Sequence, residues 1–328
     1  MLPTAVPASP PSATLADLAD RADSYAALSW APATARAYAQ DWRHYRAWCD
    51  VHGLMAAPAA PLTLTLYLTA HADRLSVATL ERRLAAVQAI HRRLGLPLDR
   101  ADQRLCETWD GIRRAHGRPA VGKRALTTAQ LSAAVAALPD TLRGIRDRAL
   151  LLLGYAGALR RSELTDLDAA PDGGGRAWLT RVPDGLIITF LRSKENQDGH
   201  TAQPVAVPVG AMPDTCPVRA VDAWLARAGI TSGPLFRSVL KGGRLTEHRL
   251  SDEDVARVVK RAVAAAGLDP RAYAGHSLRA GCITAAAGAG CPEHELMTHS
   301  RHHDLRTMRR YIRDARRFAT SPAGQLGL

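Results

Sequence analysis

A short basic segment, residues 113–124, divides the chain into two parts that follow different patterns. Its sequence, RRAHGRPAVGKR, holds two glycines and one proline and no acidic residue. Glycine and proline interrupt helices and strands, so this composition is typical of a linker between domains. The 328 residues also correspond to about two domains. We therefore predict a domain at 15–112, the linker at 113–124 and a second domain at 125–328. A disordered arm rich in Pro, Ala and Ser, residues 1–14, is expected to precede them.

The first part carries the spacing of amphipathic helices. Aromatic and apolar residues recur every three or four positions from Tyr38 to Cys49, after Pro32, which the first turn of a helix tolerates. Further helices are expected over 62–72, after the capping residue Ser76, and over 101–116. This domain is therefore predicted to be all-helical.

The second part combines helices with a few strands. Thr127 is expected to cap one helix, and a long helix is expected over 141–157. Strands are predicted at 178–182, 186–191 and 203–207, the first two joined by a Pro-Asp-Gly turn and the last two by a polar loop at 192–200. Helices are expected to return near 218–227, 251–266, 278–288, 292–299 and 304–313. The predicted fold class is mostly α, with a small three-stranded antiparallel β-sheet in the C-terminal domain.

The net charge of +12 indicates a polyanionic partner, most simply a nucleic acid. Lys occurs at only four positions, so 39 of the 43 basic residues are Arg, which binds phosphate through two parallel hydrogen bonds. A codon bias in a GC-rich genome would explain the Arg-to-Lys ratio but not the net charge. The linker would also gain from lying along DNA, because each neutralised phosphate releases counterions. The candidate DNA contacts are Arg82, Arg83, Arg92, Arg93, Arg113, Arg114, Arg118, Lys123 and Arg124. An ordinary solvated helix face is the alternative for the Arg pairs.

Several classes of protein are excluded by what the sequence lacks. No apolar stretch reaches the roughly 18 residues of a membrane span, and the N-terminus lacks the pattern of a signal peptide. The five cysteines are scattered and never form a CxxC pair, which indicates reduced thiols and a cytoplasmic location. Neither the phosphate-binding loop of an ATPase nor a dinucleotide fingerprint is present, so an ATPase or a dinucleotide enzyme is not expected.

A cluster of candidate zinc ligands lies near the C-terminus. Its members are Cys291, His294, His299, His302 and His303. Zinc sites draw on such residues, but this spacing matches no familiar Cys/His framework and no second cysteine pair completes a tetrahedron. We therefore expect no metal and no cofactor.

Two short segments carry candidate phosphate ligands. In GALRRSEL, residues 157–164, one helix is expected to end and another to begin, which places Arg160 at a tight junction where an anion could bind. A salt bridge from Arg160 to Glu163 is the alternative. In GHSLR, residues 275–279, His276 and Arg279 project from the first turn of a helix, whose dipole favours an anion. A capping His beside a surface Arg is the alternative there.

A third segment, residues 300–317, places Tyr311 in a strongly basic helix. Seven Arg and two Asp fall between Arg301 and Arg317. Positive charge favours the phenolate, so we expect a lowered pKa for Tyr311. The alternative is a Tyr that packs its ring in an amphipathic terminal helix.

In this order the three segments resemble the catalytic domain of the tyrosine recombinases, the phage-integrase family. GALRRSEL resembles the family's first arginine box, and HSLR resembles its second. The usual Leu-Gly-His before the tyrosine is here Ser300-Arg301-His302, a departure that replaces Gly by Arg. The nine-residue step to Tyr311 selects His302 as the matching histidine, because His299 lies twelve residues away.

The resemblance extends beyond these boxes. The family's β-hairpin lysine matches Lys194 on the 192–200 loop. The helical first part resembles the family's core-binding domain, so the resemblance covers about residues 15–317. Its matching residues there are Ser29, Thr34, Tyr38, Trp42 and Trp48.

The resemblance implies a site-specific recombinase or integrase that cleaves and rejoins DNA through a 3′-phosphotyrosyl intermediate, without metal or ATP. Tyr311 would be the nucleophile, and Arg160 and Arg279 would hold the non-bridging phosphate oxygens. His302 would bind the phosphate and Lys194 would protonate the departing 5′-oxygen. His276 would take or position a proton near Tyr311.

The resemblance also implies partners and a location. Double-stranded DNA is the expected partner, with self-assembly into a tetramer on DNA, a cytoplasmic and nucleoid-associated location and no membrane. The alternatives are a strand transferase similar to a type IB topoisomerase and a catalytically silent DNA-binding protein. The resemblance covers integration and excision of mobile elements and the resolution of chromosome dimers alike.

Overall fold

A computed structural model describes residues 14–119, 122–171, 176–191, 203–302 and 304–316, together with Ala323 and Leu326. The chain divides into two compact units, Met1–Ala120 and Val121–Leu328. The division falls within the segment predicted as the linker. The helix before it, however, continues to His116, so Arg113 and Arg114 belong to a last helical turn, where the dipole favours positive charge.

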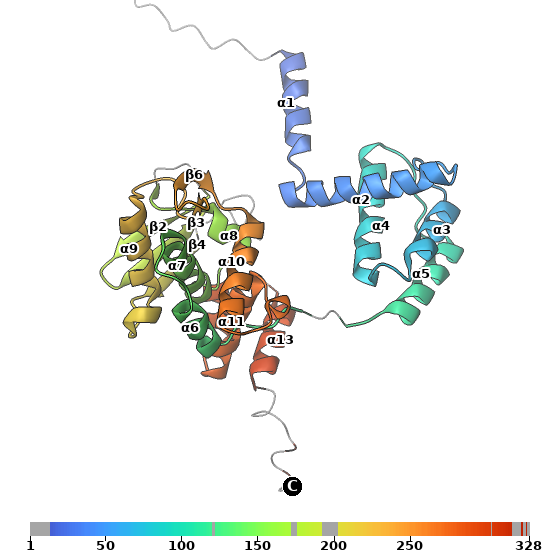
Figure 1. Cartoon of the computed structure of the whole chain (residues 1–328). Helices are drawn as coiled ribbons and strands as arrows, with labels where there is room; N and C mark the ends of the chain where they lie inside the picture. The colour runs from blue at the N-terminus through green and yellow to red at the C-terminus, as the bar shows by residue number, and fades with distance from the viewer. Residues whose placement is uncertain are drawn as a thin grey trace, which may run out of the picture. The chain divides into compact units, whose positions relative to one another are not determined.

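The N-terminal unit is helical within its described residues (Figure 1). Its helices are α1 (Leu15–Ala27), α2 (Pro32–Val51), α3 (Pro61–His71), α4 (Val77–Arg93) and α5 (Gln103–His116). Pro32 begins α2 and Ser76 caps α4, as the sequence predicts. Helix α2 packs on α4 and α3 packs on α5, around a core that includes Tyr45, Tyr67 and Leu80.

The C-terminal unit combines helices with two small sheets. Its first half holds α6 (Thr128–Ala136), α7 (Leu142–Ala156), α8 (Arg161–Asp166), β1 (Leu167–Asp168), β2 (Ala177–Val182), β3 (Gly185–Phe190) and β4 (Gln203–Pro208). Its second half holds α9 (Pro217–Ala228), β5 (Arg237–Val239), β6 (Leu245–Arg249), α10 (Asp252–Ala265), α11 (His276–Gly288), α12 (Glu293–Ser300) and α13 (Leu305–Arg316). The mostly α class with a small sheet is confirmed.

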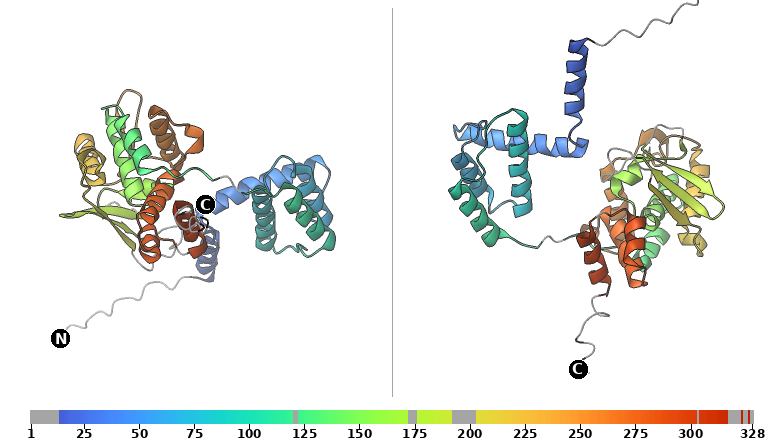
Figure 2. Two further views of the ribbon diagram at one scale, coloured as in Figure 1. Left: turned by 90° about the horizontal axis from the view of Figure 1, so that it is seen from below. Right: turned by 180° about the vertical axis from the view of Figure 1, so that it is seen from behind.

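The larger sheet has the order β1-β2-β3-β4, with antiparallel pairing from β2 to β4 and a parallel β1. It forms a layer at one side of the helices (Figure 2). The three predicted strands are confirmed, but the prediction of a three-stranded sheet was incomplete. Strand β1 has only two residues, too few to show an alternating pattern, and the hairpin of β5 and β6 is mostly half-exposed and polar.

Helix α7 runs through the core of this unit. Every residue from Ala149 to Gly154 is buried, and α7 packs against both α9 and α11. Gly281 permits the close approach of α11 to the backbone at Leu126, because a Cβ on Gly281 would lie 2.0 Å from the carbonyl oxygen of Leu126. The burial of α7 fixes the position of its C-terminal end, where GALRRSEL begins.

Helix α13 packs on α11 through a second, smaller cluster. Met308 of α13 is fully buried beside Ala158 and Ile283, and Tyr311 lies partly buried against the same cluster. This packing brings the C-terminal helix to the segment that carries His276 and Arg279. No described helix is both long enough and apolar enough to cross a membrane.

Candidate active site

Arg160 lies at the junction between α7 and α8. Gly157 ends α7, Ala158 has a positive φ of 47°, and Arg160 is the N-cap residue of α8. The Arg160 backbone N–H donates to Glu163 Oε2 at 2.8 Å, and Arg160 Nη1 donates to Glu163 Oε1 at 2.7 Å. The salt bridge that the sequence allowed as an alternative is therefore present, at a site that also gathers other guanidinium groups.

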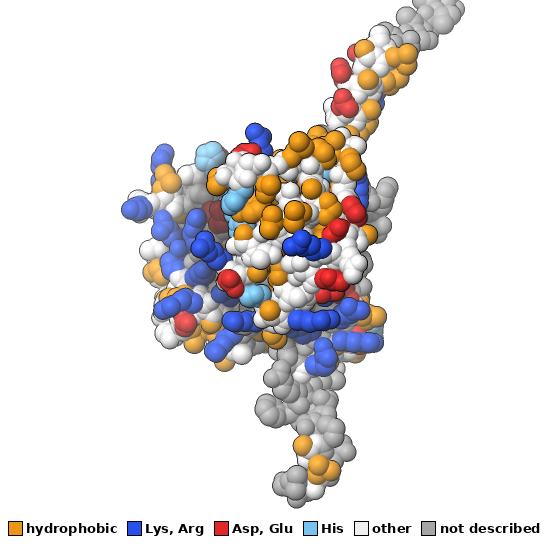
Figure 3. All heavy atoms as spheres, turned by 90° about the vertical axis from the view of Figure 1, so that its right-hand side faces the viewer, with side chains coloured by type: hydrophobic (Ala, Val, Ile, Leu, Met, Phe, Trp, Pro, Cys, Tyr) orange, Lys and Arg blue, Asp and Glu red, His pale blue; other side chains and the backbone are white. Residues whose placement is uncertain are grey.

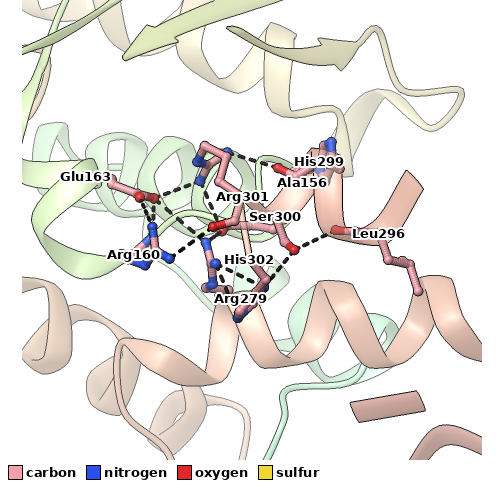
Figure 4. Close-up of polar contacts among 10 residues, drawn as sticks. Ala156, Arg160, Glu163, Arg279, Leu296, His299, Ser300, Arg301 and His302 are labelled. Atoms are coloured by element: carbon pink, nitrogen blue, oxygen red, sulfur yellow. Dashed lines mark hydrogen bonds and ion pairs between the residues drawn. The ribbon is translucent and has the colours of Figure 1, made fainter. Parts of the chain in front are cut away.

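Arg279 comes from the first turns of α11 and is 1% exposed. Its Nη1 donates to the carbonyl oxygen of Ala158 at 2.7 Å and lies 4.0 Å from Glu163 Oε2. Its Nη2 lies 3.2 Å from His302 Nδ1. Two segments more than a hundred residues apart thus place Arg160 and Arg279 around one carboxylate (Figure 4).

His302 belongs to this cluster, whereas His299 points to a different contact. His302 Nδ1 lies 2.8 Å from Ser300 Oγ and close to Arg279. His299 Nε2 contacts the carbonyl oxygen of Ala156 at 2.8 Å. Burial and the nearby Arg279 and Arg160 lower the pKa of His302 to about 3, so its ring is neutral near pH 7.

Tyr311 approaches the cluster from α13. Its hydroxyl lies 2.7 Å from His276 Nε2. Burial, with help from Arg279, lowers the pKa of His276 below its ordinary value, so this imidazole is neutral and one of its nitrogens can accept a proton.

The expected lowering of the Tyr311 pKa is wrong. Burial raises the pKa of Tyr311, and the positive charges of Arg279 and Arg310 offset only part of that effect. Local charge along the helix does not determine the direction, because the packing of α13 on α11 partly buries the phenol. The free protein therefore holds a protonated Tyr311 beside a neutral His276.

Arg301 joins the same carboxylate, and the sequence did not mark it as a site residue. Its Nη2 donates to Glu163 Oε2 at 2.8 Å, and its side chain is 3% exposed. Burial opposes the ionisation of Glu163, but Arg301, Arg160 and Arg279 hold its pKa below the ordinary value. The replacement of Gly by Arg before His302 was the one sequence signal that pointed to this residue.

Lys194 lies outside the described residues, as does His303. Among the residues that are described, no group of three or more His, Cys, Asp or Glu side chains is arranged to hold a metal ion. In the zinc candidate cluster, Cys291 Sγ instead donates to Glu295 Oε2 at 3.4 Å.

The predicted DNA contacts differ in exposure. Arg92, Arg93, Arg113, Arg114, Arg118, Lys123 and Arg124 are exposed. Figure 3 shows many Lys and Arg side chains on the surface, with Asp and Glu interspersed among them. Arg82 is also exposed, but it forms a bidentate pair with Asp41. The Arg83 side chain is 12% exposed and donates to Tyr67 Oη at 3.0 Å, so it contributes to the interior of the helical unit.

Comparisons with known proteins agree on one family. The model of the phage integrase family matches residues 124–317. An integrase/recombinase XerD homolog of Selenomonas ruminantium is 36% identical over 283 residues, which cover 85% of this chain and 81% of that protein. A tyrosine recombinase of Synechococcus elongatus is 31% identical over 306 residues, which cover 85% and 84%.

Solved structures share the fold. The XerH site-specific recombinase bound to a palindromic difH substrate, in a post-cleavage complex, matches with a TM-score of 0.60 at 15% identity, over 81% of this chain and 72% of that one. A λ integrase dimer bound to a COC′ core site matches with a TM-score of 0.56 at 16% identity, over 92% and 95%.

Proposed function

The chain belongs to the phage integrase family and is a tyrosine recombinase that acts on DNA, and from that premise we propose that it cleaves and rejoins DNA strands through a covalent bond between Tyr311 and a 3′-phosphate. The observation that carries this proposal is the 2.7 Å contact between Tyr311 Oη and His276 Nε2, beside a cluster of guanidinium groups. A nucleophile, a neutral base and positive charge for a phosphate occur together there.

The positive charge suits a phosphodiester. Three guanidinium groups, from Arg160, Arg279 and Arg301, surround the single carboxylate of Glu163. The cluster thus has an excess of two positive charges, and a phosphodiester in the transition state supplies negative charge on its non-bridging oxygens. Arg160 and Arg279 would hold these oxygens, a role that metal ions fill in many other phosphoryl-transfer enzymes.

The proton transfers follow from the ionisation states. His276 would accept the proton of Tyr311 as the phenolic oxygen bonds to phosphorus, which avoids the need for a free phenolate. The bond from phosphorus to the 5′-oxygen breaks, and Lys194 would donate a proton to that oxygen. Neutral His302 would donate one N–H to the phosphate. Because the phosphotyrosyl bond keeps the energy of the broken bond, rejoining requires no ATP.

We extend the proposal to partners on the basis of solved relatives. The XerH structure contains a difH substrate, and a λ integrase structure is a tetramer on a Holliday junction. We propose double-stranded DNA as the partner of this chain, assembly into a tetramer on two DNA sites, and a location with the nucleoid in the cytoplasm. The exposed Arg92, Arg93, Arg118, Lys123 and Arg124 would contribute backbone contacts.

A pool of nicked duplexes with a randomised core tests the proposal, because such a pool presents every short sequence that could serve as the DNA site. The nick lets the leaving strand diffuse away, so a covalent protein–DNA adduct accumulates and survives SDS. We expect the wild-type chain to form this adduct and Tyr311→Phe to form none while it retains DNA binding. An adduct formed by Tyr311→Phe would refute the assignment of the nucleophile.

The same assay separates the alternatives. A catalytically silent DNA-binding protein would give no adduct with any sequence in the pool. A strand transferase similar to a type IB topoisomerase would relax supercoiled DNA as a monomer, whereas a recombinase would select a short sequence and exchange strands between two sites.

A further inference from the structure

Arg301 occupies a backbone conformation that normally favours glycine. It ends α12 with a φ of 55°, in the left-handed region where a Cβ costs conformational energy. Among the described residues, the only other non-glycine residue with a positive φ is Ala158, and its carbonyl oxygen accepts from Arg279. Both conformations that disfavour a side chain thus occur at the candidate site, where such strain often has a functional reason.

The Arg301 guanidinium is held by protein groups from several segments (Figure 4). Its Nη2 donates to Glu163 Oε2 at 2.8 Å and its Nη1 donates to the carbonyl oxygen of His299 at 3.0 Å. Its planar group lies 4.5 Å from the centre of the Phe190 ring. Since the side chain is 3% exposed, these contacts keep the charge inside the protein.

Arg301 and Arg160 divide the carboxylate between them. The Arg301 guanidinium contacts Glu163 Oε2, while the Arg160 guanidinium contacts Oε1 at 2.7 Å, and the Arg160 backbone N–H also donates to Oε2. The Arg160 side chain is 15% exposed, five times the fraction of Arg301. Arg160 is therefore the more accessible guanidinium of this pair, and Arg301 is the one enclosed with the carboxylate. Arg160 Nη2 also donates to the Arg301 carbonyl oxygen at 3.2 Å, which links the two residues directly.

Without a cation of its own, the buried Glu163 would compete with the phosphate for Arg160 and Arg279, the two residues that form the proposed phosphate clamp. Removing one partner of a buried ion pair leaves a charge that the remaining partners must neutralise. Without Arg301, Glu163 would bind Arg160 and Arg279 more tightly and compete with the phosphate for them. We propose that Arg301 is a positioning residue that neutralises Glu163 and so leaves Arg160 and Arg279 to the scissile phosphate. This inference rests on the proposed function of the site.

The substitution Arg301→Gly removes the guanidinium and suits the backbone, because glycine adopts a φ of 55° without strain. We expect the single-turnover cleavage rate at saturating DNA to fall by about tenfold or more, with DNA affinity within about threefold of wild type. Arg227→Ala, which removes an exposed charge from α9 in the same unit, serves as the control and is expected to cleave at the wild-type rate.

The pair of variants with Glu163→Gln distinguishes positioning from mere stability. Glu163→Gln alone is expected to slow cleavage, because Arg160 loses its charged partner. In the Arg301→Gly background the same change is expected to raise the rate by about fivefold, since it removes the competitor for the clamp. A purely structural role predicts no such reversal, and a double variant no faster than Arg301→Gly would overturn the proposal.

Binding of tungstate, a phosphate-like anion, tests the same idea without cleavage. We expect tungstate to raise the Tm of the wild-type chain, and the shift to fall by at least about half in Arg301→Gly and to return in the double variant. If the wild-type chain formed no covalent adduct, the proposed function would fail while this series still decided the role of Arg301. Equal Tm shifts with tungstate in the wild-type chain and in Arg301→Gly would overturn the proposed role of Arg301.

Discussion

Each unit of the chain holds a His–Tyr pair, and the two pairs differ in what surrounds them. In the N-terminal unit, Tyr67 Oη lies 3.0 Å from His44 Nδ1, and in the C-terminal unit Tyr311 Oη lies 2.7 Å from His276 Nε2. Tyr67 is 2% exposed and packs edge-on against other aromatic rings, whereas Tyr311 is only partly buried. A His–Tyr contact alone therefore does not identify a nucleophile.

The balance of charge separates the two networks more clearly. In the N-terminal network Asp41 receives a bidentate Arg82 and lies 3.7 Å from Arg83, so two cations face one carboxylate. In the C-terminal cluster three guanidinium groups face Glu163. Similar residue types build an internal brace with an excess of one positive charge in one unit and a site with an excess of two in the other, where an anion adds stability.

The largest effect is expected from Arg160→Ala. Loss of one clamp on the phosphate should slow single-turnover cleavage at saturating DNA by about a hundredfold or more, because the charge that develops in the transition state loses a direct partner. A loss below about tenfold, or 1.4 kcal/mol, would argue against a clamp role.

Arg82→Ala is the matched change in the other network. Its side chain is 53% exposed, but Asp41 is buried and would keep only Arg83 at 3.7 Å, so loss of the pair should lower the free energy of unfolding by about 1–3 kcal/mol. At saturating DNA the cleavage rate should stay within about threefold of wild type. If Arg82→Ala slowed cleavage as much as Arg160→Ala, the contrast between brace and reactive site would be wrong.

His276→Gln is expected to slow cleavage by about a hundredfold, because the Tyr311 proton loses its acceptor. The lowered pKa of His276 means that the wild-type rate should be flat above about pH 6.5 and should fall only in more acidic solution, where the imidazole becomes protonated. The variant should lose that acidic limb. In the other unit, His44→Gln should leave the pH profile of cleavage unchanged, and a changed profile would contradict the separation of the two pairs.

A smaller effect is expected on stability in acid. Because burial and nearby Arg residues lower the pKa of His302 from 6.5 to about 3, the unfolded chain gains a proton below pH 6.5 that the folded chain does not. The free energy of unfolding should therefore decrease as the pH is lowered from about 6.5 to about 3, by at most about 1.4 kcal/mol per pH unit for one such group. Urea unfolding of wild type and His302→Gln at about pH 7.5 and about pH 5 measures this, and the variant should lose less. Equal losses would place the pH dependence elsewhere.

The order and types of the site residues were predictable because short local patterns carry them. Pro32, Ser76 and Thr127 mark helix starts that the structure confirms. Helix periodicity did not separate Arg82 from Arg83, yet one turns outward and the other lies 12% exposed beside Tyr67. That outcome depends on how α4 is rotated against its neighbours, which no local pattern specifies.

Long-range packing accounts for what the sequence did not predict at the site. The direction of the Tyr311 pKa depends on burial against α11, and the local excess of Arg suggested the opposite. Arg301 contacts a carboxylate 138 positions earlier in the chain, so its partner could not be inferred from the residues around it. Local sequence specified which groups are present, and tertiary contacts decided their ionisation.

The most direct test of the central claim is to map the covalent adduct. Wild-type chain is trapped on the nicked substrate pool, digested with protease and nuclease, and its peptides are analysed by mass spectrometry for a nucleotide-modified tyrosine. We predict that the modification falls on Tyr311 alone, and that Tyr67→Phe forms the adduct normally while Tyr311→Phe does not. A modification on any other residue, or an adduct that persists in Tyr311→Phe, would contradict the account.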